Sequence, residues 1–84
     1  MRLDKFLKVS RILKRRTVAA SACLSNKVCV NSQIAKPGKQ LKLGDIVEIS
    51  FAQNTLIFEV LKLNSSTKKN DATDMYKILS DTNE

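Results

Sequence analysis

The 84-residue sequence predicts a single α+β domain, in which two N-terminal helices pack on a small antiparallel β layer and a short C-terminal helix follows. Three observations predict this class. Apolar residues recur at helical spacing near the N-terminus, and apolar and polar residues alternate between positions 47 and 63. Hydrophobic residues make up 43% of the chain, which is enough for a packed core and argues against global disorder.

Two helices are expected in the first part of the chain. The first is expected over residues 2–9, because Leu3, Phe6 and Leu7 lie on one helical face and basic residues lie on the other. The second is expected over residues 14–25, a segment rich in alanine. The small alanine side chains would allow the two helices to approach each other closely.

Turn-forming residues separate the second helix from the strands. Asn26 stands where the helix is expected to end, and asparagine tolerates the left-handed backbone found at many helix C-termini. A short strand is expected over residues 28–30, followed by a turn at Asn31 and Ser32. Serine adopts the left-handed conformation less readily than glycine, so the geometry of this turn stays open. The Pro-Gly step at residues 37–38 marks a second break.

The third part of the chain has the periodicity of strands. Val47, Ile49 and Phe51 alternate with polar residues, as in a half-buried strand. A second β-rich run covers residues 55–63, and we expect the two runs to form an antiparallel hairpin. A tight Gly-Asp turn at residues 44–45 precedes the first run.

The C-terminal segment is expected to form a linker and a last helix. Residues 64–69 are polar and would form the linker. Asn70 or Asp71 can cap a helix that continues through Tyr76–Leu79. Residues 80–84 are expected to be frayed.

Charge is distributed unevenly along the chain. Residues 1–44 contain eleven Lys and Arg and one acid, Asp4, a net charge of +10. Residues 45–84 contain four Lys and seven acids, a net charge of −3. This imbalance indicates a polyanionic partner, and nucleic acid is the usual one. The alternative interpretation is a basic, solvated face with no partner.

The composition disfavours several other functions. The chain has no His, no Gly-rich phosphate loop and no Ser or Cys with an obvious base, so we do not expect an enzyme. Two cysteines, Cys23 and Cys29, cannot fill the four coordination positions of zinc, so we expect no metal and no cofactor. No apolar run has the length of a membrane span and no signal-peptide stretch opens the sequence, so we expect a cytoplasmic protein.

The basic residues gather around the two predicted helices and form the candidate RNA-binding face. If the apolar faces of the helices pack inward, these side chains project outward, and arginine can bind phosphate in a bidentate manner. Asp4 would hold one of the arginines in place, or it is a plain surface acid near a helix N-terminus. The candidate residues are Arg2, Asp4, Lys5, Lys8, Arg11, Lys14, Arg15 and Arg16. A second, weaker group would add to this face only if its loops fold beside the helices: Lys36, Lys39 and Lys42.

Several short segments of the sequence resemble the S4-type RNA-binding domain, which pairs helices with a small β layer. They are residues 1–7, the basic segment 11–19, Val28–Asn31, Lys36–Gly38 and Gly44–Asp45. The resemblance covers residues 1–63 and leaves residues 64–84 as the polar linker and short C-terminal helix with a frayed tail. Within that superfamily the chain is most similar to the RqcP family of bacterial ribosome quality-control proteins, which is related to a small ribosome-binding heat-shock protein.

The resemblance implies a non-enzymatic adaptor that binds dissociated large ribosomal subunits carrying peptidyl-tRNA. It implies contacts with large-subunit ribosomal RNA and with tRNA, and support for a partner factor that adds an untemplated C-terminal tail to the stalled nascent chain. Arg2 and Arg16 match family positions associated with RNA contact, and Asp4 matches the acid of the motif. We expect the protein to act as a monomer.

Alternatives from other functional classes stay open at this point. The chain could be a ribosome-assembly or large-subunit rescue factor that acts without a nascent chain, or a targeting module that acts with an RNA-modifying enzyme. A peripheral membrane binder is disfavoured, because the short first helix has no Trp and offers little apolar area for insertion.

Overall fold

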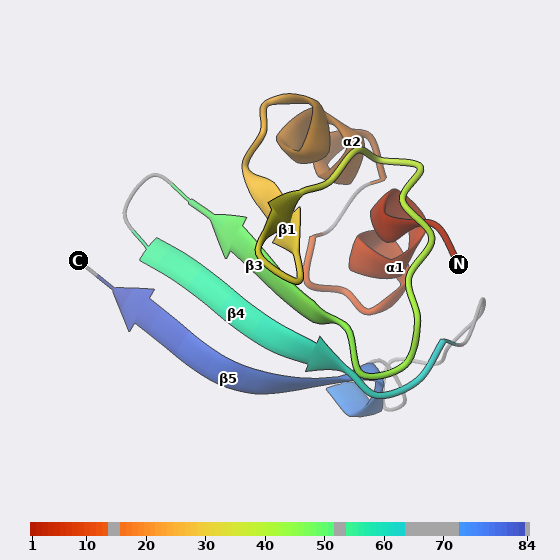
Figure 1. The fold of residues 1–84 in the computed structure, drawn as a ribbon, viewed down its shortest axis with the longest axis vertical. Helices are drawn as coiled ribbons and strands as arrows, with labels where there is room; N and C mark the ends of the chain where they lie inside the picture. The colour runs from red at the N-terminus through yellow and green to blue at the C-terminus, as the bar shows by residue number, and fades with distance from the viewer. Residues whose placement is uncertain (14–15, 52–53, 64–72, 84) are drawn as a thin grey trace.

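The computed structural model describes residues 1–13, 16–51, 54–63 and 73–83. Its elements in chain order are α1 (Leu3–Val9), α2 (Arg16–Leu24), β1 (Val28–Val30), β2 (Gln33–Ile34), β3 (Ile46–Ser50), β4 (Asn54–Val60), the single-turn helix η1 (Thr73–Met75) and β5 (Tyr76–Asn83). Both α-helices lie over one face of the curved sheet (Figure 1). The α+β class and the two N-terminal helices are confirmed. The predicted linker at 64–69 and the helix caps at Asn70 and Asp71 lie outside the described residues.

The five strands form one antiparallel sheet. Their order is β2-β1-β3-β4-β5, and every neighbouring pair is antiparallel. The predicted hairpin is β3–β4, in which Val47 lies opposite Phe58 and Ile49 lies opposite Leu56. Because side chains alternate across a strand, this register places the apolar residues of both strands on the face that the helices cover.

The core lies between this face and the helices. From β3 and β4 the side chains of Val47, Ile49, Phe58 and Val60 are buried, at 1% exposure or less. The ring of Phe6 from α1 stacks on that of Phe58, with centroids 6.1 Å apart and planes at 10°. This aromatic pair fixes α1 on the middle of the sheet, and therefore fixes the direction in which the polar side of α1 faces.

The end of α2 shows why asparagine occurs at position 26. Asn26 has a φ of 60°. Its N–H donates to the carbonyl of Cys23 at 3.1 Å, and the N–H of Lys27 donates to the carbonyl of Ala22 at 3.1 Å. This is the Schellman arrangement, which satisfies carbonyls that the last helical turn leaves without a partner. The predicted helix end at Asn26 is confirmed.

The turn between β1 and β2 is left-handed at both central residues. Asn31 has a φ of 52° and Ser32 has a φ of 70°, as in a type I′ hairpin turn. The Asn31 side chain accepts a hydrogen bond from the N–H of Ile46 at 3.0 Å and donates one to Asp45 at 3.1 Å. These tertiary bonds hold Asn31 in place, so the neighbouring serine adopts a conformation that would favour glycine.

The predicted C-terminal helix is wrong. Among the described residues of this segment, η1 alone is helical, and residues 76–83 form β5, which pairs with β4 from Val60↔Tyr76 to Asn54↔Asn83. The spacing of Met75, Ile78 and Leu79 fits a helix, but the open edge of β4 offers backbone hydrogen bonds along the whole segment, and this pairing overrides local preference. The tail that we expected to be frayed lies largely in this strand, through Asn83.

Candidate nucleic-acid interface

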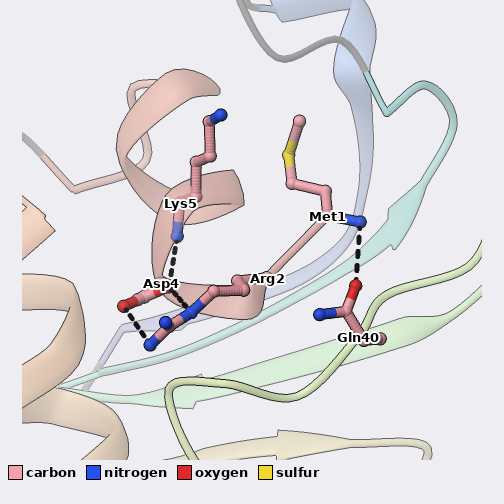
Figure 2. A network of polar contacts seen from close by, with 5 residues as sticks. All are labelled: Met1, Arg2, Asp4, Lys5 and Gln40. Atoms are coloured by element: carbon pink, nitrogen blue, oxygen red, sulfur yellow. Dashed lines mark hydrogen bonds and ion pairs between the residues drawn. The ribbon is translucent and has the colours of Figure 1, made fainter.

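The candidate interface is built around the first turn of α1. Arg2 is the N-cap residue, with an extended backbone, and its side chain makes no cap hydrogen bond. Its side chain instead turns back to Asp4: Nε lies 3.2 Å from Oδ1, and Nη2 donates to Oδ2 at 3.3 Å (Figure 2). Two parallel contacts of this kind orient the planar guanidinium as well as attract it.

The two partners of this ion pair differ in exposure. The Asp4 side chain is only 5% exposed, whereas the Arg2 side chain is 49% exposed. A buried carboxylate is costly unless it is paired, so it holds its cationic and N–H donors strongly. Asp4 also accepts the N–H of Lys5 at 2.8 Å. The geometry therefore places a fixed guanidinium at the surface and its anchor inside the protein, which agrees with the interpretation of Asp4 as a positioning residue.

The loop of residues 36–40 packs beside the same turn. The N–H of Leu3 donates to the carbonyl of Lys39 at 2.8 Å, and the N–H of Asp4 donates to the carbonyl of Pro37 at 3.2 Å. Arg2 also forms an isolated antiparallel bridge with Gln40. These bonds use N–H groups that the start of a helix would otherwise leave without partners. These bonds bring the loop that contains Lys36 and Lys39 beside α1. The two lysines can therefore extend the basic face.

The Lys5 side chain of α1 does not converge on Arg2. Figure 2 shows the Lys5 side chain leaving the helix in a different direction from the guanidinium. Lys5 is half-buried, and Lys8 and Arg11 are exposed. Lys5 therefore diverges from the Arg2–Asp4 pair, while Lys8 and Arg11 add exposed positive charge at and beyond the end of α1.

Arg11 has an unusual backbone. It follows α1 with a φ of 63°, and its N–H donates to the carbonyl of Lys8 at 3.0 Å. The N–H of Leu13 caps the carbonyl of Leu7 at 3.0 Å. A side chain in the left-handed region costs about 1–2 kcal/mol, and such strain is concentrated at functional sites. No feature of the sequence indicates this conformation, since arginine rarely adopts it.

Part of the predicted face is not placed by the structure. Lys14 and Arg15 lie outside the described residues, and Arg16 is placed only as the first residue of α2. Their contribution to binding therefore stays a prediction.

Comparison with known proteins decides the family. Residues 1–47 match the S4 domain model. The RQC P-site tRNA stabilizing factor of Streptococcus pneumoniae is 51% identical over 82 residues, which cover 98% of this chain and 93% of that protein. The factor of the same name from Bacillus subtilis is 43% identical over 79 residues, covering 94% of this chain and 92% of that protein. The chain belongs to the RQC P-site tRNA stabilizing factor family.

A solved structure of a differently named protein shares the fold. The structure described as a trimeric form of heat shock protein 15 from Vibrio cholerae superposes with a TM-score of 0.87, at 26% sequence identity. The match covers 95% of this chain and 82% of that chain. The likeness therefore extends over nearly the whole of this family member, including the part beyond the S4 domain.

The interior beside the interface contains the thiol of Cys23, which is buried. Burial and the nearby charge of Asp4 together raise the pKa of the Cys23 thiol to about 11, with burial the larger cause. Over the residues that the structure describes, no three His, Cys, Asp or Glu side chains gather as a metal site would require. Neither α-helix has the length and apolar character needed to cross a bilayer.

Proposed function

We propose that this protein is a non-enzymatic RNA-binding adaptor that stabilises a P-site tRNA on a dissociated large ribosomal subunit. The names of its relatives state the tRNA role for those proteins. The observation in this chain that supports the proposal most is the Arg2–Asp4 pair. It presents an oriented, half-exposed guanidinium on a rigid helix, which suits recognition of a phosphate at a defined place on a folded RNA.

The mode of recognition follows from the side chains available. Aromatic residues make up only 5% of the chain, so a platform that stacks several unpaired bases is disfavoured. Cations on the outer side of α1 suit the phosphates of structured RNA instead. Selectivity would then come mainly from the shape of the folded RNA, with base edges contributing less.

The proposed adaptor would have a wider role in ribosome quality control. The adaptor would act in the cytoplasm as a monomer, and would contact both large-subunit ribosomal RNA and tRNA on subunits that still hold a nascent chain. It would support a partner factor that tails the stalled chain. Ribosome quality control is the process that this arrangement would serve.

Cosedimentation with large ribosomal subunits tests the proposal. Arg2→Ala and Arg16→Ala are expected to abolish cosedimentation while circular dichroism stays native. Lys77→Ala is the matched control. Lys77 is exposed and lies opposite Glu59 in the β4–β5 register, on the face of the sheet away from the helices. If both arginine variants sedimented like the control, the proposed interface would be wrong.

The tRNA part of the proposal needs a separate comparison. Large subunits that carry peptidyl-tRNA are expected to bind more tightly than empty ones, since the adaptor would gain contacts with the tRNA. Equal affinity for both would contradict the tRNA role and would favour a large-subunit assembly or rescue factor.

A further inference from the structure

A small pocket is formed by residues of β1, β2 and the following loop, which packs against α1. Its volume is about 260 Å³, and it is lined by Val30, Gln33, Ile34, Ala35, Lys36 and Lys39. Val30 and Ala35 are each only 4% exposed, so they belong to the buried wall of the pocket. Gln33 and both lysines are exposed, and so belong to its outer side.

The pocket combines three chemical features. Its buried wall is apolar, its outer side has two cations, and the Gln33 amide supplies both a donor and an acceptor. Ile34, which also lines the pocket, is 62% exposed, so much of its apolar surface remains available for contact. An apolar surface beside paired cations suits a ligand that has a flat, weakly polar part and a negative charge.

The position of the pocket connects it with the candidate interface. The N–H of Lys39 donates to the carbonyl of Lys36 at 3.0 Å, so a turn fixes the spacing of the two lysines. The carbonyl of Lys39 in turn accepts the N–H of Leu3, next to Arg2. A Cβ built on Gly38 would lie 4.0 Å from Nη2 of Arg2, so the guanidinium lies beside this loop. An RNA strand on the Arg2 side of α1 would therefore pass close to the pocket.

We propose that this pocket holds one unpaired nucleotide of the bound RNA, with its base against the apolar wall and its phosphate beside Lys36 and Lys39. The proposal rests on the proposed RNA-binding function and names a feature of the RNA that it would recognise. The pocket is smaller than the roughly 300–1,000 Å³ that drug-sized ligands occupy, which suits a single base. Unpaired bases are also the part of RNA that proteins can enclose, since duplex bases are stacked.

The lining residues predict the character of this contact. None of them is aromatic, so the base is held by apolar contact and by the Gln33 amide, without ring stacking. Recognition would therefore depend on the presence of a base more than on its identity. This distinguishes the pocket from platforms that stack several bases.

A two-by-two binding experiment tests the pocket. The RNA is a hairpin with one bulged uridine, and the matched RNA has an abasic residue at that position, which keeps the phosphate and removes the base. We expect the full-length protein to bind the uridine form about fivefold more tightly, somewhat less than a stacked base contributes. Ile34→Ala is expected to remove most of this difference and to leave affinity for the abasic RNA unchanged. The control is Leu43→Ala, because Leu43 is 65% exposed and does not line the pocket.

The outcomes separate this inference from the proposed function. If the uridine and abasic RNAs bind equally well, or if Ile34→Ala preserves the difference, the pocket proposal is overturned while RNA binding stands. If neither RNA binds but the protein still cosediments with large subunits, the pocket proposal fails and the proposed function stands; if cosedimentation is also absent, both fail. If free uridine monophosphate displaces the RNA at concentrations comparable to those of the hairpin, the ligand is a free nucleotide and the proposed RNA occupant is wrong.

The lysines supply a second, independent measurement. Lys39→Gln is expected to weaken binding of both RNAs by the same factor, because the phosphate is present in both. Lys77→Gln on the far face is expected to change neither affinity. Equal effects of these two variants would overturn the proposed phosphate contact.

Discussion

Arg2 is held by a buried carboxylate and still exposes half of its side chain. Removing the Asp4 charge therefore distinguishes two explanations of RNA affinity, the total charge of the protein and the orientation of the Arg2 guanidinium. If total charge alone determined affinity, Asp4→Asn would bind RNA more tightly, because the net charge rises from +7 to +8. We expect weaker binding, by about 1 kcal/mol or fivefold, because the guanidinium loses its orientation.

The matched control for this prediction is Asp74→Asn. Asp74 is exposed, and its substitution makes the same change in net charge. RNA affinity measured by filter binding is expected to rise slightly in this variant. Tighter binding of Asp4→Asn than of wild type, with both proteins folded at the assay temperature, would show that Asp4 does not position Arg2.

Two residues with left-handed backbones allow stability and binding to be separated. Arg11 and Ser32 have φ values of 63° and 70°. Glycine at either position removes strain of about 1–2 kcal/mol but adds unfolded-state entropy, so we expect a net stabilisation of about 0.5–1 kcal/mol for each. Arg11→Gly should also weaken RNA binding, whereas Ser32→Gly should not. Urea unfolding and RNA titration of both variants check this, and unchanged binding of Arg11→Gly would remove Arg11 from the interface.

The raised pKa of Cys23 predicts both its reactivity and a pH effect. With a pKa of about 11, roughly one thiol in a thousand is ionised at pH 8, so iodoacetamide is expected to label Cys29 well before Cys23.

The ordinary pKa of a cysteine thiol is 9.0, so the folded state keeps the Cys23 proton between about pH 9 and 11 while the unfolded state loses it. Folding stability therefore falls as pH rises through this window. Cys23→Ala should show a weaker fall in urea unfolding, and labelling of Cys23 as fast as Cys29 would contradict the buried environment.

At the level of elements, the parts predicted correctly from the sequence are those with strong local signals. The apolar spacing in α1, the alanines of α2 and the alternation in β3 each specify their element. The predicted helix through residue 79 and the predicted frayed tail from residue 80 are wrong over residues 76–83, because the spacing of Met75, Ile78 and Leu79 fits a helix and only the free edge of β4 selects a strand. In the site, the basic cluster around Asp4 could be predicted from the charge pattern, but the pairing of Asp4 with Arg2, in preference to the other arginines, could not. The packing of loop 36–40 against α1 could not, because it depends on backbone bonds between distant segments.

The docking of the C-terminal segment gives a prediction at this scale. Met75 is fully buried at the end of η1, directly before β5, and its carbonyl accepts the N–H of Leu61 at 2.8 Å. Met75→Ala is expected to lower the free energy of unfolding by about 2–4 kcal/mol, because it leaves a cavity at the edge of the core. Leu79→Ala, at 48% exposure, is the control and should cost far less. Equal urea midpoints for the two variants would contradict the packing of this segment.

At the scale of the whole molecule, the cations of α1 and two glutamates of the sheet lie on opposite sides. The basic residues of α1 lie on the helical side, whereas Glu48 and Glu59 alternate with buried residues of β3 and β4 and so lie on the far face of the sheet. Such a separation orients the protein as it approaches a polyanion, because the acidic face is repelled. Binding should therefore depend strongly on salt even though the net charge is only +7.

The salt dependence of binding is a quantitative test of this orientation. If about five phosphates are neutralised, log K is expected to fall with log salt with a slope of about −3.5 to −4.5. Arg2→Ala should reduce the magnitude of the slope by about 0.7–0.9, because one counterion fewer is released. Lys77→Ala, on the acidic side, should leave the slope unchanged. A slope near zero, or equal slopes for wild type and Arg2→Ala, would show that binding does not use the helical side in the way the charge distribution requires.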